Sequence, residues 1–252
     1  MTTLPDRRFG GLDRLFGLTA AERIRTAHVA VVGIGGVGSW AAEALARSGV
    51  GQITLVDYDQ VAESNVNRQI HSVQASIGQA KVIAMRQRIL SFFPECQVNC
   101  VEAFAEPDNW PAILPAGVNA VVDACDQTRA KTAMAIWAKR TGALHVMVGA
   151  AGGKKCAEKM AVADLLEVSH DPLLAKVRYQ LRKEFAVTGA KKKLGITCVY
   201  SPEAVAPPDG SCGVAGDGSL NCHGFGSVVT VTASFGMCAA GVILNKLSSA
   251  SA

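Results

Sequence analysis

Short runs of apolar, often β-branched residues alternate with longer segments of helical character along the first 150 residues of the chain. The pattern predicts buried strands at 29–32, 52–57, 97–101, 120–123 and 145–148. Helices are predicted between them at 40–47, 78–93, 107–114 and 128–140. Strands that alternate with helices in this way form a parallel sheet covered on both faces. We therefore expect an α/β fold, Rossmann-like and doubly wound, with a mostly parallel sheet.

The second half of the chain lacks this alternation and predicts a more irregular region. A strand pattern covers 160–163. An amphipathic helix is predicted at 172–185, because Leu173, Leu174, Val177 and Leu181 share one face. Residues 201–226 are rich in Gly, Pro and Ser and are typical of a loop.

Residues 227–244 form an uncharged and moderately apolar run. The run is long enough for a short membrane span, but Thr, Ser and Gly residues interrupt it. We interpret it as a C-terminal apolar helix buried against the sheet or a dimer partner, with membrane association through 227–244 as the alternative.

The segment before the first strand contains Arg7, Arg8 and Arg14 among several glycines. This composition predicts an extended, mobile basic arm over 1–17. A short helix is predicted at 20–26, with Thr19 as its cap.

Composition limits the class of protein. The chain has 252 residues, of which 49% are hydrophobic and 18% charged, as expected for a compact globular protein. Its eight cysteines include no CxxC pair, so we expect free thiols and no structural zinc site. No basic segment followed by an apolar one opens the sequence, which predicts a cytoplasmic protein.

Four glycines follow the first predicted strand and precede the first long helix: Gly33, Gly35, Gly36 and Gly38. Glycines let backbone N–H groups approach a phosphate, and the first amides of a helix have no internal partner. Asp57 ends the second strand nineteen residues after Gly38, a spacing at which a carboxylate can bind a ribose. Together these features predict a nucleotide site.

A nicotinamide dehydrogenase, a methyltransferase and an adenylating enzyme all share a glycine turn and an acid. The polar loop after Asp57 separates them, because it carries Asn65 and Arg68 and leads to Lys81. Arg and Lys can stabilise the charge that develops when a nucleophile attacks the α-phosphate of ATP. Asp126 follows a later strand and could hold Mg²⁺. We therefore favour an adenylating enzyme that uses ATP and Mg²⁺.

Five motifs resemble the ubiquitin-activating, ThiF and MoeB superfamily of adenylating enzymes. They are Gly33-Ile-Gly-Gly-Val-Gly-Ser39, Asp57-Tyr-Asp59, Asn65-Val-Asn-Arg68-Gln69, Gly78-Gln-Ala-Lys81 and Asp123-Ala-Cys-Asp126. The resemblance implies a nucleotide site that includes Asp59 and Gln69, ribose contact from Asp57, and phosphate contacts from Asn65, Arg68 and Lys81. It further implies a Mg²⁺ or pyrophosphate role for Asp126. Arg8 or Arg14 would reach the partner's site in a homodimer.

Further motifs resemble the family of tRNA threonylcarbamoyladenosine dehydratases. They are Arg8-Phe-Gly-Gly, Gly149-Ala-Ala-Gly-Gly153, Asp171-Pro-Leu, Lys193-Leu-Gly195, Cys198-Val-Tyr-Ser201, Asn221-Cys222 and Gly224-Phe-Gly226. This resemblance implies ATP-dependent cyclisation of threonylcarbamoyladenosine beside the tRNA anticodon, by a homodimer. One domain is then expected over 1–252, with a nucleotide-binding core at 18–150 and a substrate and tRNA side at 151–252.

A local excess of positive charge fits a tRNA substrate. Residues 172–195 contain seven Lys or Arg and one Glu. We expect RNA contacts from Arg182, Lys183, Lys191, Lys192 and Lys193. Two alternatives stay open: an activator of a ubiquitin-like or sulfur-carrier protein, and a nucleotide sensor that recruits a cysteine desulfurase or sulfur-acceptor protein.

Overall fold

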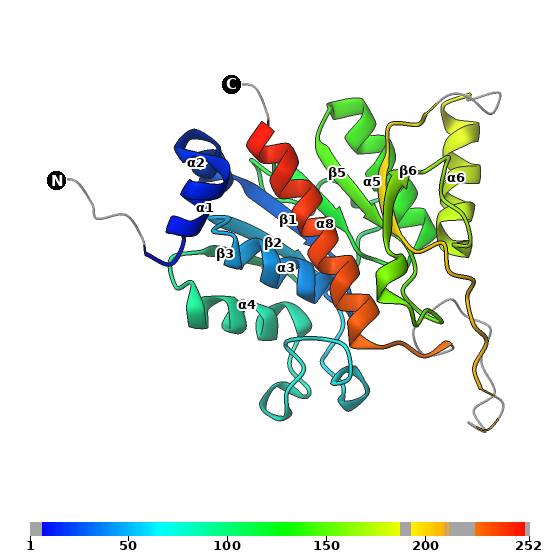
Figure 1. Ribbon diagram of the computed structural model, residues 1–252, viewed down its shortest axis with the longest axis horizontal. Coiled ribbons are helices and arrows are strands. Elements are labelled where there is room, and N and C mark those ends of the chain that lie inside the picture. Colours follow the sequence, from blue (N-terminus) through cyan, green and yellow to red (C-terminus); the bar gives the residue numbers. More distant parts are fainter. Residues whose placement is uncertain (1–6, 187–192, 210, 212–224, 250–252) are drawn as a thin grey trace.

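The computed structural model describes residues 7–186, 193–209, 211 and 225–249. Within them, seven strands form one sheet in the order β3-β2-β1-β4-β5-β7-β6 (Figure 1). The edge strand β6 pairs antiparallel with β7, and every other pair is parallel. The strands are β1 His28–Val32, β2 Gln52–Val56, β3 Gln97–Val101, β4 Ala120–Asp123, β5 Leu144–Val148, β6 Ala161–Asp164 and β7 Thr197–Tyr200.

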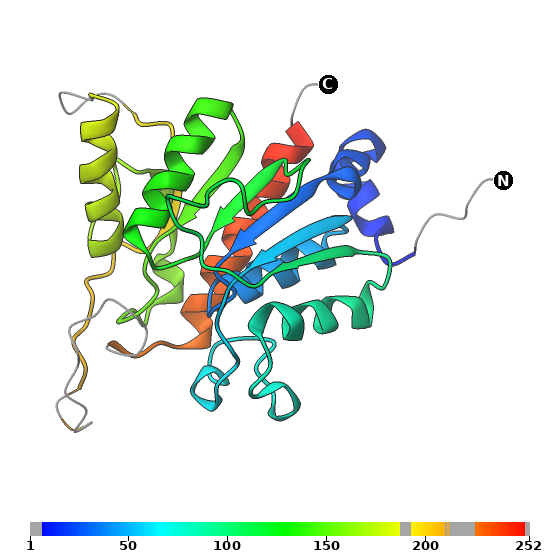
Figure 2. The same cartoon turned by 180° about the vertical axis from the view of Figure 1, so that it is seen from behind.

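Helices cover both faces of this sheet (Figures 1 and 2). α2, α3, α4 and α8 pack on one face, and α5 and α6 pack on the other. The α-helices are α1 Gly10–Phe16, α2 Leu18–Thr26, α3 Gly38–Arg47, α4 Lys81–Phe92, α5 Thr128–Thr141, α6 Pro172–Glu184 and α8 Val229–Ser249. Short 3-10 turns lie at Glu63–Asn65, Gln74–Ser76 and Ala157–Lys159.

Strand β1 shows why the apolar pattern dictates this layering. Val29 and Val31 point into the cluster under α3, α4 and α8, whereas Ala30 and Val32 point into the cluster under α5. Successive side chains of a strand face opposite sides, so a strand that is apolar throughout must be covered twice. The predicted doubly wound α/β fold is thereby confirmed.

The order of the strands places the site. From β1 the chain builds outward to β2 and β3, and then returns to build β4 and β5 on the other side. Ligands of such sheets bind at the carboxyl ends of the strands, where the order reverses. That point lies here between β1 and β4.

Residues 7–17 do not form the extended arm that was expected over 1–17, and residues 1–6 lie outside the described residues. Residues 10–16 form α1, and Phe9 is buried with its ring 4.7 Å from that of Phe93. Leu12 and Phe16 pack against the same cluster. Apolar residues at 9, 12 and 16 have helical spacing, so burying them outweighs the flexibility that Gly10 and Gly11 confer.

Smaller corrections follow from proline and glycine. Turns replace the expected helix at 107–114, where prolines disfavour helical geometry in the residues before them. α4 begins at Lys81 rather than 78, because Gly78 has a φ of +84°. Strand β7 was not predicted, since its four residues carry no periodicity that distinguishes them from a loop.

The C-terminal apolar helix is present as α8. It is the one helix in the described residues that is long and apolar enough to span a membrane. Val231, Phe235, Ala239 and Ile243 are nevertheless buried in the core cluster beneath it. A Cβ on Gly236 would lie 2.4 Å from the Val37 carbonyl oxygen, so α8 approaches the start of α3 as closely as glycine permits. The interpretation as a helix packed on the sheet is thus confirmed.

Candidate nucleotide-binding site

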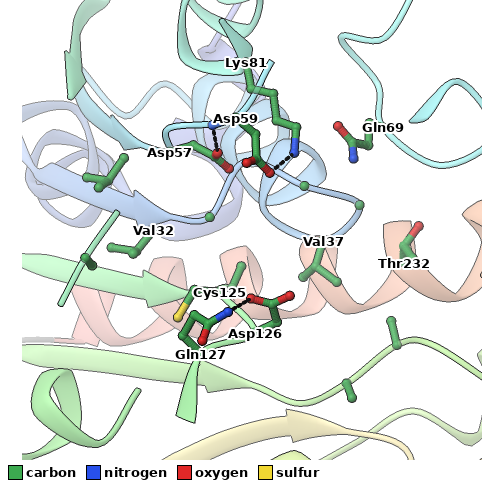
Figure 3. Close-up of a pocket in the computed structure, with 18 of the residues that line it drawn as sticks. Val32, Val37, Asp57, Asp59, Gln69, Lys81, Cys125, Asp126, Gln127 and Thr232 are labelled. Atoms are coloured by element: carbon green, nitrogen blue, oxygen red, sulfur yellow. Dashed lines mark hydrogen bonds and ion pairs between the residues drawn. The ribbon is translucent and has the colours of Figure 1, made fainter. Parts of the chain in front are cut away.

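A pocket of about 280 Å³ opens at the carboxyl ends of the parallel strands. Loops that follow each of the strands β1 to β5 surround it, and α8 contributes from one side (Figure 3). Most of the residues expected at the site line this pocket. They are Gly33, Gly35, Gly36, Asp57, Asp59, Arg68, Gln69, Lys81 and Asp126.

The glycine turn is tight because the backbone of the β4 loop packs on it. Gly33 has a φ of +87°, and a Cβ there would lie 2.9 Å from the Ala124 backbone. A Cβ on Gly38 would lie 1.7 Å from the Gly33 carbonyl oxygen, so Gly38 shapes the turn from behind and does not line the pocket. α3 begins at Gly38, which directs its first amides toward the pocket.

Asp57 clamps this turn to the end of β2. Its carboxylate accepts hydrogen bonds from the Ile34 amide at 2.6 Å and from the Asp59 amide at 2.8 Å. Burial raises the pKa of Asp57, and the nearby Lys81 charge and the two amides oppose that rise. Each carboxylate oxygen has two lone pairs, so Asp57 can still accept a hydrogen bond from a ligand hydroxyl.

Lys81, at the end of the polar loop, is held to the residues that follow β2. Its ammonium lies 2.8 Å from the Asp59 carboxylate, and its backbone amide donates to the Asp59 carbonyl at 2.9 Å. Figure 3 shows this pair at the pocket wall, opposite Asp126. A buried lysine with one partner retains two donors for anionic oxygens.

Arg68 and Gln69 are buried residues of this loop, on the side that faces the glycine turn. The Arg68 guanidinium donates to the Ser64 carbonyl at 2.6 Å and to the Asn67 side chain at 2.9 Å. Arg68 Nε and Gln69 Oε1 have no protein partner among the described residues. Buried polar atoms are almost always satisfied, so these two are suited to a polar ligand in the pocket.

Asn65 has a different place from the one expected. Its side-chain oxygen accepts from the Ala62 amide at 3.0 Å, and it does not line the pocket. It therefore shapes the loop that carries Arg68.

Asp126 lies exposed at the pocket rim, where its carboxylate accepts a hydrogen bond from the Gln127 side chain at 3.3 Å. No group of three or more metal-ligating side chains is found among the described residues. Mg²⁺ in phosphate sites takes one or two carboxylates and completes its shell with phosphates and water. The accessible Asp126 carboxylate fits that donor set.

Lys131 was missed by the sequence reasoning. It is fully buried in α5, and it donates to the Asp123 carboxylate and to the Val148 carbonyl, each at 2.8 Å. Burial would raise the pKa of Asp123, but Lys131 and His145 beside it lower that pKa overall. The sequence did contain a sign of this burial, because Lys131 lies on the same helix face as the apolar residues Ala130 and Met134.

The remaining pocket walls were also unpredicted. Thr232 of α8 faces the glycine turn, where a Cβ on Gly36 would lie 3.2 Å from its methyl group. Residues 149–152 and Leu173 form the wall on the β5 side. Gly149 is required there, because a Cβ would lie 2.1 Å from the carboxylate of Asp171, which caps α6.

The N-terminal arginines lie away from this chain's own pocket. Arg8 is 2.8 Å from Glu95 and donates to the Phe92 carbonyl, at the far end of α4 from Lys81. Arg14 is exposed on α1.

Of the residues expected to bind tRNA, Arg182 and Lys183 are exposed on α6. Lys193 is exposed 3.8 Å from Glu167. Lys191 and Lys192 lie outside the described residues.

Taken together, a doubly wound sheet, a glycine turn at a helix start and a pocket with convergent Arg, Lys and Asp side chains define a nucleotide-binding α/β protein. Comparison with known proteins specifies the class further. The chain belongs to the ThiF family, whose sequence profile matches residues 11–250.

Several relatives match over nearly the full length. The chain is 43% identical to the tRNA threonylcarbamoyladenosine dehydratase of Escherichia coli over 250 residues, which covers 96% of this chain and 93% of that protein. It is 38% identical to the dehydratase of Haemophilus influenzae over 244 residues, covering 96% and 94%. The crystal structure of the E. coli dehydratase in complex with ATP has a TM-score of 0.86 and 42% identity, covering 96% and 93%.

Proposed function

We propose that this protein is an ATP-dependent adenylating enzyme of the cytoplasm that dehydrates N6-threonylcarbamoyladenosine in tRNA, next to the anticodon. The observation that carries the proposal is similarity at 43% identity over almost the whole chain to a dehydratase of that name. The pocket supports it, since Arg68, Lys81 and Asp126 converge on the glycine turn.

The reaction has two steps. An oxygen of the threonyl carboxylate attacks the α-phosphorus of ATP, which forms an acyl-adenylate and releases pyrophosphate. The neighbouring carbamoyl group then attacks the activated carbonyl carbon, which closes a ring, releases a proton and expels AMP. The nucleoside thereby loses one water. No protein nucleophile is required, because the attacking group is already held on the substrate at high effective molarity.

The chain's residues bind and stabilise charge in the first step. Asp57 holds the glycine turn and accepts a hydrogen bond from a ribose hydroxyl, while Arg68 and Lys81 bind the phosphates as negative charge develops, and Gln69 contacts the nucleotide beside them. Mg²⁺ bound with ATP would neutralise phosphate charge, and Asp126 is the residue that would hold it.

The remaining parts of the chain receive roles by the same proposal. The protein acts as a homodimer in which Arg8 or Arg14 reaches the partner's phosphates. Residues 18–150 bind ATP within a single domain, and 151–252 hold the tRNA, with Arg182, Lys183 and the 191–193 lysines contacting RNA phosphates.

The test is turnover of the nucleoside. The protein is incubated with ATP and tRNA that carries threonylcarbamoyladenosine, the RNA is digested, and the nucleoside is weighed by mass spectrometry. Loss of one water that depends on ATP supports the proposal. An unchanged nucleoside, with adenylation of a ubiquitin-like protein's C-terminus instead, would contradict it.

A further inference from the structure

Exposed side chains on the outer face of α6 form one continuous row. We call Pro172, Lys176, Tyr179 and Lys183 the α6 stripe. These residues are spaced four, three and four apart, so at 3.6 residues per turn they share one face of the helix. Their opposite face carries Leu174, Val177 and Leu181, which are buried in the core. The row therefore points away from the protein along the whole helix.

The stripe has no partners among the described residues. The Tyr179 side chain is 74% exposed and makes no hydrogen bond or ring contact with another described residue. Lys176 and Lys183 have no ion pair there either. Two other cations near the stripe are already engaged, since Arg178 donates to the Val168 carbonyl at 2.5 Å and Arg140 of α5 lies 2.7 Å from Glu184. The stripe thus presents two uncommitted cations on either side of an uncommitted aromatic ring.

The N-terminal end of α6 lies beside the nucleotide pocket. Leu173, one residue after Pro172, lines that pocket. A rise of 1.5 Å per residue places Tyr179 about 9 Å and Lys183 about 15 Å further along the helix axis. Figure 1 shows α6 at the outer edge of the molecule, beside the β6 edge of the sheet. A strand whose reacting nucleotide enters the pocket can therefore continue along this face.

We propose that the α6 stripe is a docking surface for single-stranded RNA. The inference rests on the proposed function, which supplies a substrate in an unpaired loop. Lys176 and Lys183 contact backbone phosphates, and the ring of Tyr179 stacks on an unpaired base that flanks the reacting nucleoside. Alternation of cations with an exposed aromatic ring is how proteins hold single strands, because every base offers a π-face and every linkage a charge.

The experiment measures binding of an anticodon stem-loop that carries threonylcarbamoyladenosine, with a fully paired RNA of equal length beside it. Tyr179→Ala should weaken stem-loop binding by about 10-fold, and Tyr179→Phe should retain it. Lys176→Ala with Lys183→Ala should flatten the slope of log K against log salt by about one to two units. Leu15→Ala is the matched control, because Leu15 is also 74% exposed and lies on α1.

The outcomes separate this inference from the function on which it rests. Weaker binding by Tyr179→Ala that is specific to the stem-loop supports it. Wild-type affinity of Tyr179→Ala, or an equal loss on paired RNA, overturns it. Binding of the wild type to acidic lipid vesicles but not to the stem-loop also overturns it. Wild-type protein that binds the stem-loop without cyclising it with ATP contradicts the proposed function alone.

Discussion

The ammonium of Lys131 lies 2.8 Å from the carboxylate of Asp123, and both side chains are fully buried beneath the nucleotide pocket. The same ammonium donates to the backbone carbonyls of Asp123 and Val148, so one side chain ties the end of β4 to the end of β5. The loops that follow these strands form the pocket walls at Asp126 and at 149–152. Lys131 therefore sets how far apart those walls lie.

Lys131→Met should destabilise the protein by about 3–5 kcal/mol, because it leaves the Asp123 charge buried without a partner. Removing both charges with Lys131→Met and Asp123→Asn should recover part of the loss. Urea unfolding measures both, and Lys159→Met on the surface is the control. A loss below about 1 kcal/mol in the single variant would show that the pair does not stabilise the fold.

The same pair predicts a pH dependence. The pKa of Asp123 is lowered in the folded state, so its stabilisation is complete above the unfolded pKa of about 4. It should be lost as the pH falls through the lowered pKa. Unfolding free energies measured across acid pH for the wild type and the double variant test this. Only the wild type should lose stability as Asp123 is protonated. Parallel pH curves would rule it out.

Asp126→Asn should slow adenylation by about 100-fold with little effect on stability, because the side chain is exposed and acts on charge at the phosphates. Exchange of labelled pyrophosphate into ATP, measured with the modified tRNA present, reports this step. Gln127→Ala, which removes the hydrogen-bond donor to Asp126, is the neighbouring control. Normal exchange in Asp126→Asn would show that Asp126 has no role in adenylation.

The cysteines should not act as nucleophiles. Cys125 lies at the pocket, but burial and the adjacent Asp123 raise the pKa of its thiol well above the ordinary value. Burial likewise raises the pKa of Cys198. Cys212 and Cys222 lie outside the described residues. Ser or Ala at 198, 212 or 222 should leave cyclisation measurable, whereas a trapped acyl or persulfide adduct on any cysteine would disprove this account.

The N-terminal arginines should act across a dimer. Arg8 lies at the opposite end of α4 from Lys81, too far to serve its own pocket. Subunits with Arg8→Ala and Arg14→Ala are mixed with subunits that carry Lys81→Ala, each inactive alone. Recovered cyclisation means that the two defects lie in different, shared sites. No recovery in confirmed heterodimers argues for sites within one subunit.

Local sequence patterns were sufficient to predict the residues on one half of the pocket. Asp57 could be predicted because it directly follows a strand at a set distance from the glycine turn, and Lys81 because it lies in the first turn of the helix predicted from 78. Both positions follow from strand ends gathering at one edge of a parallel sheet. The α6 helix could be predicted from its own sequence, since its four apolar residues define one face of a helix without reference to any other element.

The other half depends on tertiary packing that no local pattern contains. Thr232 lies 164 residues after Arg68 in the sequence and reaches the turn only because α8 packs on α3. From the sequence alone, Lys131 cannot be distinguished from a surface lysine. Only the fold places the Asp123 carboxylate and the Val148 carbonyl next to its ammonium. Asn65 was assigned to phosphate by resemblance, and its hydrogen bond to Ala62 shows a loop-shaping contact.

The central claim, that the substrate's own carboxylate is adenylated, is tested most directly by following an oxygen atom. The threonyl carboxylate of the modified tRNA is labelled with ¹⁸O, the protein and ATP are added, and the AMP released is weighed. Because the attacking carboxylate oxygen stays on phosphorus when AMP leaves, the account predicts one heavy oxygen in AMP for each nucleoside cyclised. Cyclised nucleoside accompanied by unlabelled AMP would contradict it.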